Sequence, residues 1–554
     1  METEETPQTP PEGSPQGSPE DSPRAAPGTA PVAPAAPAVQ SSDAVRGPRH
    51  ARTSLISAIS ATSATSRGPL GGGPRPRRSP AARRALVAAV AGCAVLGGAL
   101  VFLPDRGEDS APPALGPAGR AAAAVGAGAP AAMPDLAVLI GEREAHLRAH
   151  PGDDQSWAVL GSAYVERGLR TADSAYYPKA ERALRTSLRT RPERNAAALT
   201  GLAALGNARH DFRGAKKWGE QAVRLAPRRW AAHAALLDAY RGLGDDKGVE
   251  RALAKVRGLS PGTAAARVRS GAVYRDRGWR EDAAAALSDA AALARTPAER
   301  AACLYRVGEL AWERGEPGDA LRHYDAALAA DPDHHPSLAA KGRALAAVGR
   351  TSDALQAYRA ALVRRPAPEY ALELGELYES LKLRPAASAQ YDLVRARVRQ
   401  GGLGGVNDER VLGVFEAEHG DAGAAVRRLT AEFRRHASPE NADALGWALH
   451  RSGKSEEGLK HVEAAVKKGP RSALFAYHRG AIERALGRYG AARRHLAEAL
   501  RINPHFSPLA APAAHAALKA LGDPPDGGPA QVYAPRGAPI PKLPRPTKPS
   551  GQSD

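Results

Sequence analysis

The chain has 554 residues, a formal net charge of +18 at pH 7, and only 5% aromatic residues. This length exceeds what one hydrophobic core needs, so it excludes a small single-core domain and predicts several domains or one extended array. Two cysteines, Cys93 and Cys303, exclude a disulfide framework and a cysteine-rich metal site. A basic chain attracts anionic partners, and salt screens that attraction.

Residues 1–84 are rich in proline, serine, alanine and glycine. Such a segment buries too little apolar surface to offset its ordering entropy, so we predict disorder with extended conformers around the prolines. The tail, residues 523–554, is also proline-rich and is predicted to be disordered.

Residues 85–103 carry no charged side chain. A helix of this length measures roughly 28 Å, about the thickness of a bilayer's hydrocarbon core, so we predict one transmembrane helix. Because arginines precede it and acidic residues follow it, residues 1–84 are expected in the cytoplasm and the rest of the chain outside. Two alternatives stay open, namely acylation at Cys93 within "VAGC" and export through a twin-arginine signal at Arg83–Arg84.

The chain changes character after a Gly/Ala/Pro-rich stretch, residues 104–132, which we predict to be a linker. Residues 133–522 show nearly continuous helical periodicity, interrupted by short turns of glycine, aspartate and proline. No strand pattern is found there. Cys303 falls on a predicted helix, and we expect it to be a small buried apolar residue.

A repeating pattern of small residues runs through this helical region. The stretch "GELAWERGEPGDALRHYDAALAADP" (308–332) has glycine, alanine, tyrosine and proline at intervals that recur from Gly342 to Pro366. Closing prolines such as Pro332 and Pro366 lie 34 residues apart. This period and pattern resemble the tetratricopeptide repeat (TPR), in which two antiparallel helices meet at small residues. We therefore expect Gly342 to face Ala354.

The resemblance implies an all-α fold, an α-solenoid of about ten TPR helix-turn-helix repeats within residues 133–522. A lone helix is expected before the first repeat, and residues 506–521 are expected to form a C-terminal capping helix that covers the last apolar face. The repeats are predicted to begin near Asp154, Asn195, Trp230, Ala264, Ala301, His335, Pro368, Val406, Pro439 and Ala473.

The sequence contains no nucleotide-binding, zinc-protease or hydrolase motif. We interpret the glycine-rich stretch 401–410 as a loop between repeats and "DPDHHP" (331–336) as an ordinary helix start. We therefore predict that the chain is not an enzyme and holds no cofactor and no metal.

In TPR families the first helices of successive repeats line a concave face that binds peptides or partner helices. Positions at fixed offsets from the first-helix glycine mark this groove, and the basic clamp that holds carboxylate tails in some families is absent. Aromatic and arginine side chains are the usual anchors of partner surfaces, although the same aromatics could pack between repeats. Two groove patches are candidates for partner binding: Tyr305, Trp312 and Arg343, and then Trp447, Tyr477 and Arg484.

Other aromatic residues match the core positions of the repeat, and we assign them a structural role: Trp157, Tyr164, Tyr240, Tyr274, Tyr324, Tyr358 and Tyr391. The preferred hypothesis for function is a membrane-anchored, extracytoplasmic TPR scaffold that binds a protein or peptide in its groove. The alternatives are a basic array that binds anionic cell-envelope polymer or lipid, and a cytoplasmic regulator that contacts nucleic acid.

Overall fold

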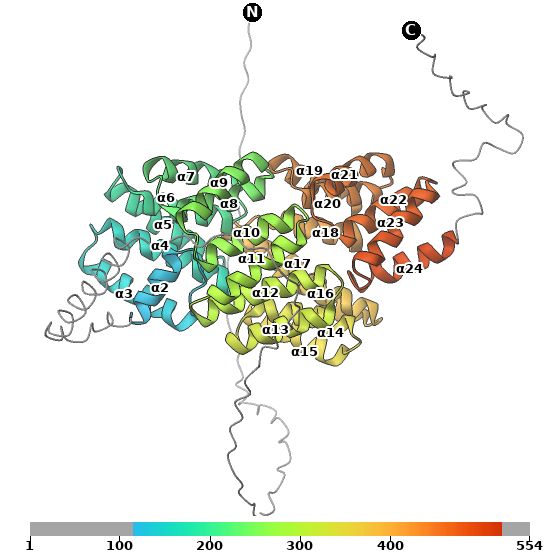
Figure 1. Ribbon diagram of the computed structural model, residues 1–554, viewed down its shortest axis with the longest axis horizontal. Helices are drawn as coiled ribbons and strands as arrows, with labels where there is room; N and C mark the ends of the chain where they lie inside the picture. The colour runs from blue at the N-terminus through green and yellow to red at the C-terminus, as the bar shows by residue number, and fades with distance from the viewer. Residues whose placement is uncertain (1–114, 523–554) are drawn as a thin grey trace, which may run out of the picture. The chain divides into compact units, whose positions relative to one another are not determined.

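The computed structural model describes residues 115–522, and all regular secondary structure in this range is helical (Figure 1). The prediction of an α-helical solenoid is confirmed for these residues. The segments predicted to be disordered and the predicted transmembrane helix, residues 85–103, lie outside the described residues. Between residues 115 and 522 no helix has both the length and the hydropathy needed to cross a membrane.

Ten antiparallel helix hairpins follow one another in the described chain. Their helix pairs are α4–α5 (Asp154–Thr171, Tyr176–Thr190), α6–α7 (Ala196–Ala208, Phe212–Leu225), α8–α9 (Trp230–Leu243, Asp246–Leu259), α10–α11 (Ala264–Asp276, Arg280–Leu293), α12–α13 (Pro297–Glu313, Pro317–Ala330), α14–α15 (His335–Ala347, Thr351–Arg364), α16–α17 (Pro368–Ser380, Arg384–Leu403), α18–α19 (Glu409–His419, Ala422–Arg435), α20–α21 (Pro439–Arg451, Ser455–Lys468) and α22–α23 (Ala473–Ala485, Tyr489–Ile502).

The predicted repeat starts agree with these helices, with the largest offsets at the fifth and eighth repeats. The fifth begins earlier than predicted because Thr296 caps α12, its hydroxyl accepting a hydrogen bond from Glu299 N, and Pro297 follows in the first helical turn. In the eighth, α18 starts at Glu409, since the residues before it form a loop that contacts another part of the chain.

Three further helices flank the hairpins. The predicted lone helix before the first repeat is α3 (Met133–Ala149), and the predicted C-terminal cap is α24 (Ala510–Leu521), which packs on Leu496 of the last hairpin. Helix α2 (Pro117–Gly126) was not predicted, because it lies in the stretch 104–132 that was assigned as a linker. Its four consecutive alanines are strong helix formers, and Pro117 suits a first helical position.

The turn inside each hairpin explains part of the glycine pattern. Gly315 and Gly349 adopt φ angles of 77° and 79°, a left-handed conformation that glycine takes without a steric penalty. The glycine inside each first helix has another role. A methyl group at Gly342 would lie 2.7 Å from Tyr358 Cδ2, so this glycine accommodates the tyrosine ring. Ala354, which is expected to face Gly342, is fully buried on the second helix of this hairpin, and the atoms nearest to Gly342 belong to Tyr358.

The array coils so that hairpins far apart in the chain touch each other. Arg209 Nε donates to Gly404 O at 2.9 Å, and Arg209 O accepts from Asn407 N at 3.0 Å. Farther along, Arg280 donates to Arg471 O at 2.9 Å, and Asn503 Nδ2 donates to Trp312 O at 2.8 Å. Each of these contacts joins residues that lie five or six hairpins apart, as the neighbouring green and orange helices of Figure 1 illustrate.

The glycine-rich stretch 401–410 takes part in this contact between turns of the coil. It contains the end of α17 and the loop before α18, which agrees with the predicted inter-repeat loop. A methyl group at Gly404 would lie 2.4 Å from Ser174 O, and Gly405 has a φ of 80° beside the Arg209 side chain. Glycine is required here because two backbones approach closely.

Candidate binding surface on the inner face

The first helices of the hairpins line two cavities, and we call the surface that these helices share the inner face. The first cavity, about 390 Å³, is bounded by α4, α6, α8 and α10. The second, about 550 Å³, is bounded by α12, α14 and α16. Of the predicted groove residues, Trp312 and Arg343 line the second cavity, whereas Trp447, Tyr477 and Arg484 lie on α20 and α22.

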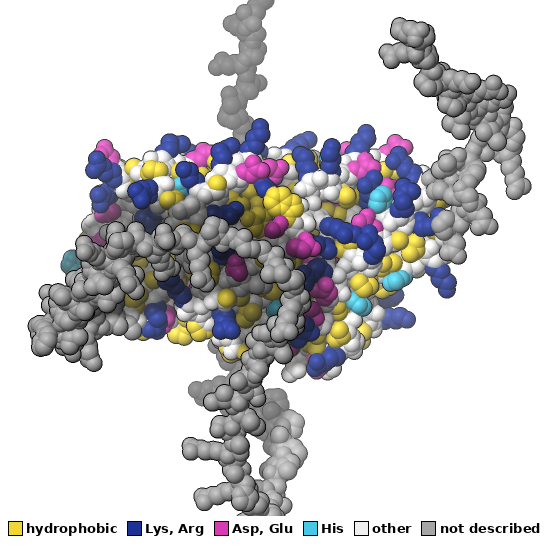
Figure 2. Space-filling view, viewed as in Figure 1, with side chains coloured by type: hydrophobic (Ala, Val, Ile, Leu, Met, Phe, Trp, Pro, Cys, Tyr) yellow, Lys and Arg dark blue, Asp and Glu magenta, His cyan; other side chains and the backbone are white. Residues whose placement is uncertain are grey.

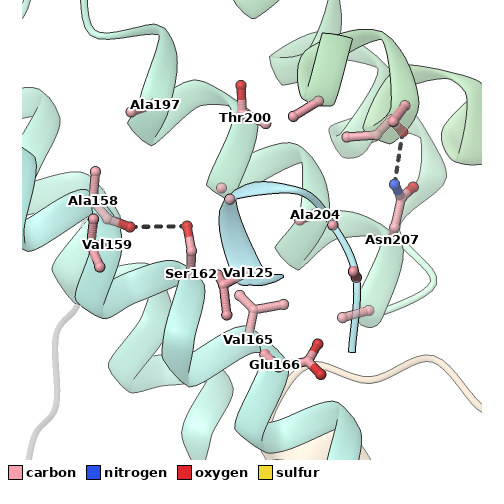
Figure 3. Close-up of a pocket in the computed structure, with 18 of the residues that line it drawn as sticks. Val125, Ala158, Val159, Ser162, Val165, Glu166, Ala197, Thr200, Ala204 and Asn207 are labelled. Carbon is pink, nitrogen blue, oxygen red and sulfur yellow. Dashed lines mark hydrogen bonds between the residues drawn. The ribbon is translucent and has the colours of Figure 1, made fainter. Parts of the chain in front are cut away.

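Helix α2 and the residues after it cover part of the first cavity. Figure 3 shows Val125 of α2 beside Val165 and Glu166 of α4, opposite Ala204 and Asn207 of α6. The Glu166 carboxylate accepts a hydrogen bond from Ala131 N at 3.2 Å, and burial raises the pKa of this carboxyl group. Ala121 and Ala131 are both 1% exposed. The N-terminal part of the inner face is therefore already in contact with a segment of the same chain.

The second cavity has a mixed wall of aromatic, acidic and proline residues. Trp312, Arg343, Glu373 and Glu376 come from the first helices, and a wall from much later in the chain faces them. This later wall consists of Pro504, His505, Phe506, Ser507, Pro508, Ala511, Pro512 and His515. The hydrogen bond from Asn503 to Trp312 O holds the two walls together. The cavity thus exists because the coil brings the tenth hairpin back to the fifth.

The first candidate patch is assembled around Arg343. Its guanidinium lies 4.9 Å from the centre of the Trp312 ring, donates to Glu309 Oε1 at 2.6 Å, and lies 3.6 Å from Glu373 Oε1. The hydroxyl of Tyr324 donates to the same Glu309 oxygen at 2.6 Å. Arg343 is thereby held against Trp312 with its charge compensated by two carboxylates, and these contacts raise its pKa despite burial.

Tyr305, the third residue predicted for this patch, is only partly buried, but its ring packs on neighbours other than Arg343. It lies 5.6 Å from the His334 ring and 6.2 Å from the Tyr324 ring. It does not line the second cavity, which Trp312 and Arg343 do. The structure therefore brings two of the three predicted residues to one cavity.

The second candidate patch is more deeply packed. Trp447 is 6% exposed, stacks on His478 with ring centres 4.2 Å apart, and donates from Nε1 to Glu418 Oε1 at 2.6 Å. The Tyr477 ring lies 5.7 Å from Trp447 and 5.6 Å from Phe506. Arg484 is exposed on the same helix as Tyr477. Because Phe506 also lines the second cavity, it connects the two predicted patches.

Several residues at the second cavity could not be selected from the sequence. Phe506 and His515 belong to the segment predicted only as a cap, and Tyr358 was assigned to the core. Glu373 lies on α16, one turn before Glu376, which also lines the cavity. No local signal identifies Phe506 and His515, because their position depends on a contact across five hairpins.

Cys303, His334 and His335 are all buried. Cys303 is 1% exposed, and burial raises its thiol pKa to about 12, as expected for a small apolar core residue. Burial lowers the pKa of His334 to about 4 and of His335 to about 2, and His335 Nδ1 lies 2.9 Å from the Tyr370 hydroxyl. Within residues 115–522 no group of histidine, cysteine and acidic side chains could hold a metal ion.

Basic side chains are frequent on the face that Figure 2 shows. Figure 2 shows Lys and Arg side chains spread over the visible face with Asp and Glu between them. The wall of the second cavity differs, since it contributes two carboxylates, Glu373 and Glu376, and one guanidinium. The inner face at this cavity is therefore more acidic than the surface around it.

Comparisons with known proteins agree with the hairpin architecture. The family model described as Tetratricopeptide repeat matches residues 339–401 and 444–505. A fungal relative, the tetratricopeptide repeat and J domain-containing co-chaperone DNJ1 of Fusarium oxysporum, is 41% identical over 81 residues, which is 14% of this chain and 16% of the relative. The chain thus matches about one sixth of that relative's length.

Several solved structures are similar to parts of this chain. The human IFIT1 dimer with PPP-AAAA is 16% identical, covers 57% of this chain and 72% of its own, and has a TM-score of 0.39. PilW, a type IV pilus biogenesis factor, is 20% identical, covers 36% of this chain and 92% of its own, and has a TM-score of 0.31. The family match therefore identifies tetratricopeptide repeats within residues 339–401 and 444–505, and the other hairpins share the same helical architecture.

Proposed function

We propose that this chain is a membrane-anchored, extracytoplasmic scaffold that binds a protein or peptide partner on its inner face. The observation that carries the proposal is the second cavity, where Trp312 and Arg343 lie together on the first helices. Aromatic and arginine side chains at a concave surface are typical anchors for polypeptide partners. The chain acts by binding and not by catalysis, since the inner face gathers packing and ion-pairing groups without a nucleophile activated by a base.

The membrane part of the proposal rests on sequence alone. Residues 85–103 are uncharged, with five arginines in the ten residues before them and three acidic residues soon after. This arrangement favours a cytoplasmic N-terminus and a solenoid on the other side of the membrane.

Alkaline phosphatase fusions test this topology, because that enzyme is active only outside the cytoplasm. A fusion after residue 132 is expected to be active, and a fusion after residue 70 is expected to be inactive. Replacing Leu96 and Leu100 by arginine should abolish the activity of the first fusion, since a charged residue at a helix centre costs roughly 3 kcal/mol on insertion. An inactive fusion after residue 132, with the protein present at normal levels, would place the repeats in the cytoplasm.

Site-specific photo-cross-linking tests partner binding on the inner face. A photoreactive residue at Ser380, which lines the second cavity, is expected to capture a discrete partner in cells. The matched position is Val363, which is 82% exposed on the second helix α15. Equal capture at both positions, or capture at Val363 alone, would show that the partner binds elsewhere. With the purified chain, capture at low salt that disappears near physiological salt would favour an anionic polymer over a protein partner.

A further inference from the structure

The second cavity contains an acidic side chain whose charge is poorly compensated. Glu376 lies on its wall, and its nearest basic neighbour is His419, whose Nε2 lies 3.8 Å from Oε1, beyond ordinary hydrogen-bond distance. His419 in turn lies closer to a second carboxylate, with Nδ1 at 3.2 Å from Glu379. Burial raises the pKa of Glu376, His419 opposes this shift, and Glu418 and Glu379 nearby add to it. Among the described residues, no lysine or arginine forms an ion pair with this carboxylate.

The other charged groups at the cavity do not supply that partner. Arg343 is engaged by Glu309 at 2.6 Å and by Glu373 at 3.6 Å, and it lies over the Trp312 ring. Glu373 accepts a further hydrogen bond from the Tyr358 hydroxyl at 2.8 Å. Two carboxylates, Glu309 and Glu373, thus already contact the Arg343 guanidinium, and Glu376 adds a further carboxylate to the cavity wall.

The rest of the wall suits the stem of a long side chain. Phe506, Leu377 and Trp312 present apolar surface, and Pro504, Pro508 and Pro512 add rigid surface from the later wall. Glu373 and Glu376 are three residues apart on α16, so they lie on one face of that helix. Lysine and arginine bury an apolar stem while their charged ends seek anionic partners. The volume of about 550 Å³ is ample for one such side chain with water.

We propose that the second cavity binds a basic side chain of the partner polypeptide, with its cationic end at Glu373 and Glu376 and its stem against Phe506 and Trp312. This inference rests on the proposed function, since it names the chemistry of the same partner. The first cavity is a poorer candidate because α2 already covers part of it. The partner segment is thus predicted to be basic, although this chain is itself basic overall.

Labelled pentapeptides test the proposal by fluorescence anisotropy with the full chain in detergent. The probes are Gly-Ala-X-Ala-Gly, where X is arginine, lysine or citrulline; citrulline has nearly the shape of arginine without its charge. The arginine and lysine peptides are expected to bind about tenfold more tightly than the citrulline peptide. E376Q should weaken binding of the arginine peptide by about tenfold. E369Q is the matched control, because Glu369 lies on the same helix outside the cavity wall, and it should leave affinity unchanged.

Two results overturn the proposal, namely equal affinity for the arginine and citrulline peptides, or an affinity that E376Q leaves unchanged. Tighter binding of spermidine than of either basic peptide, measured by competition, would also overturn it by assigning the cavity to a free polyamine. E376Q is expected to fold, because it removes a buried charge without changing side-chain shape. These outcomes are separate from the scaffold function, since cross-linking at Ser380 reports a partner whether or not a basic side chain enters the cavity.

Discussion

At the scale of single residues, the repeat depends on glycines that make room for aromatic rings between the two helices of a hairpin. Gly342 faces Tyr358, which is 3% exposed, and Gly308 faces the fully buried Tyr324 in the same way. Gly342→Ala should therefore overpack the hairpin and destabilise the protein by about 1–3 kcal/mol. Thermal or chemical denaturation of the full chain measures this loss.

The matched control for this substitution is Gly318→Ala. Gly318 also lies in a helix, α13, but an added methyl group there meets no atom within 4 Å. Alanine lowers the conformational entropy of the unfolded chain, so this change should be neutral or stabilise the protein by up to about 1 kcal/mol. If both substitutions had the same effect, the contact between Gly342 and Tyr358 would not limit packing.

The charge of Glu376 makes a second prediction at this scale. Its pKa is raised above the ordinary value of 4.5, so the folded protein binds this proton more tightly than the unfolded chain. The contribution of this group to the free energy of unfolding therefore falls as the pH rises from the ordinary pKa through the raised pKa. Glu376→Gln should raise the melting temperature at pH 7 by about 1–2 °C, and this advantage should vanish below pH 4. A lower melting temperature for the variant at pH 7 would mean that His419 compensates the carboxylate fully.

At the scale of helices and loops, the glycine-rich loop before α18 joins two turns of the coil. An added methyl group at Gly404 would lie 2.4 Å from the backbone oxygen of Ser174. Gly404→Ala should separate these backbones and destabilise the protein by about 1–3 kcal/mol. Gly402→Ala is the control, because an added methyl group there meets nothing within 4 Å. Denaturation curves that coincide for the two variants would contradict a close contact at Gly404.

The positions of the helices could be predicted from the sequence, whereas the contacts between distant hairpins could not. Helical periodicity and the spacing of small residues are local, so the ten hairpins and the cap α24 could be predicted, with errors mainly at starts such as that of α12. Helix α2 was missed because its alanines and glycines were interpreted as the composition of a linker, whereas it packs against α3 and α4. Likewise, Trp312 and Arg343 could be assigned to one groove from their spacing. Phe506 could not, because its place there depends on a contact across five hairpins.

At the scale of the whole molecule, contacts between turns alter how stability is distributed. In an open repeat array each repeat contacts only its neighbours, so damage to one repeat spreads to adjacent repeats. Here the tenth hairpin also contacts the fifth through Asn503 and Trp312, and the segment after it closes the second cavity. The binding surface and the stability of the C-terminal hairpin are thereby coupled.

Leu496→Ala tests this coupling by hydrogen exchange. Leu496 is fully buried against Gly480 and α24, so its truncation should destabilise the tenth hairpin by about 2–5 kcal/mol. Exchange should increase in α22–α24 and also near Trp312 at the end of α12, because the Asn503 contact loosens with the hairpin. Helix α5 is the internal reference, since no described contact joins it to the tenth hairpin. An increase confined to α20–α24 would mean that the coil transmits nothing between its turns. In that case the second cavity would depend only on the packing of neighbouring hairpins, and the tenth hairpin would not stabilise the surface that Glu376 faces.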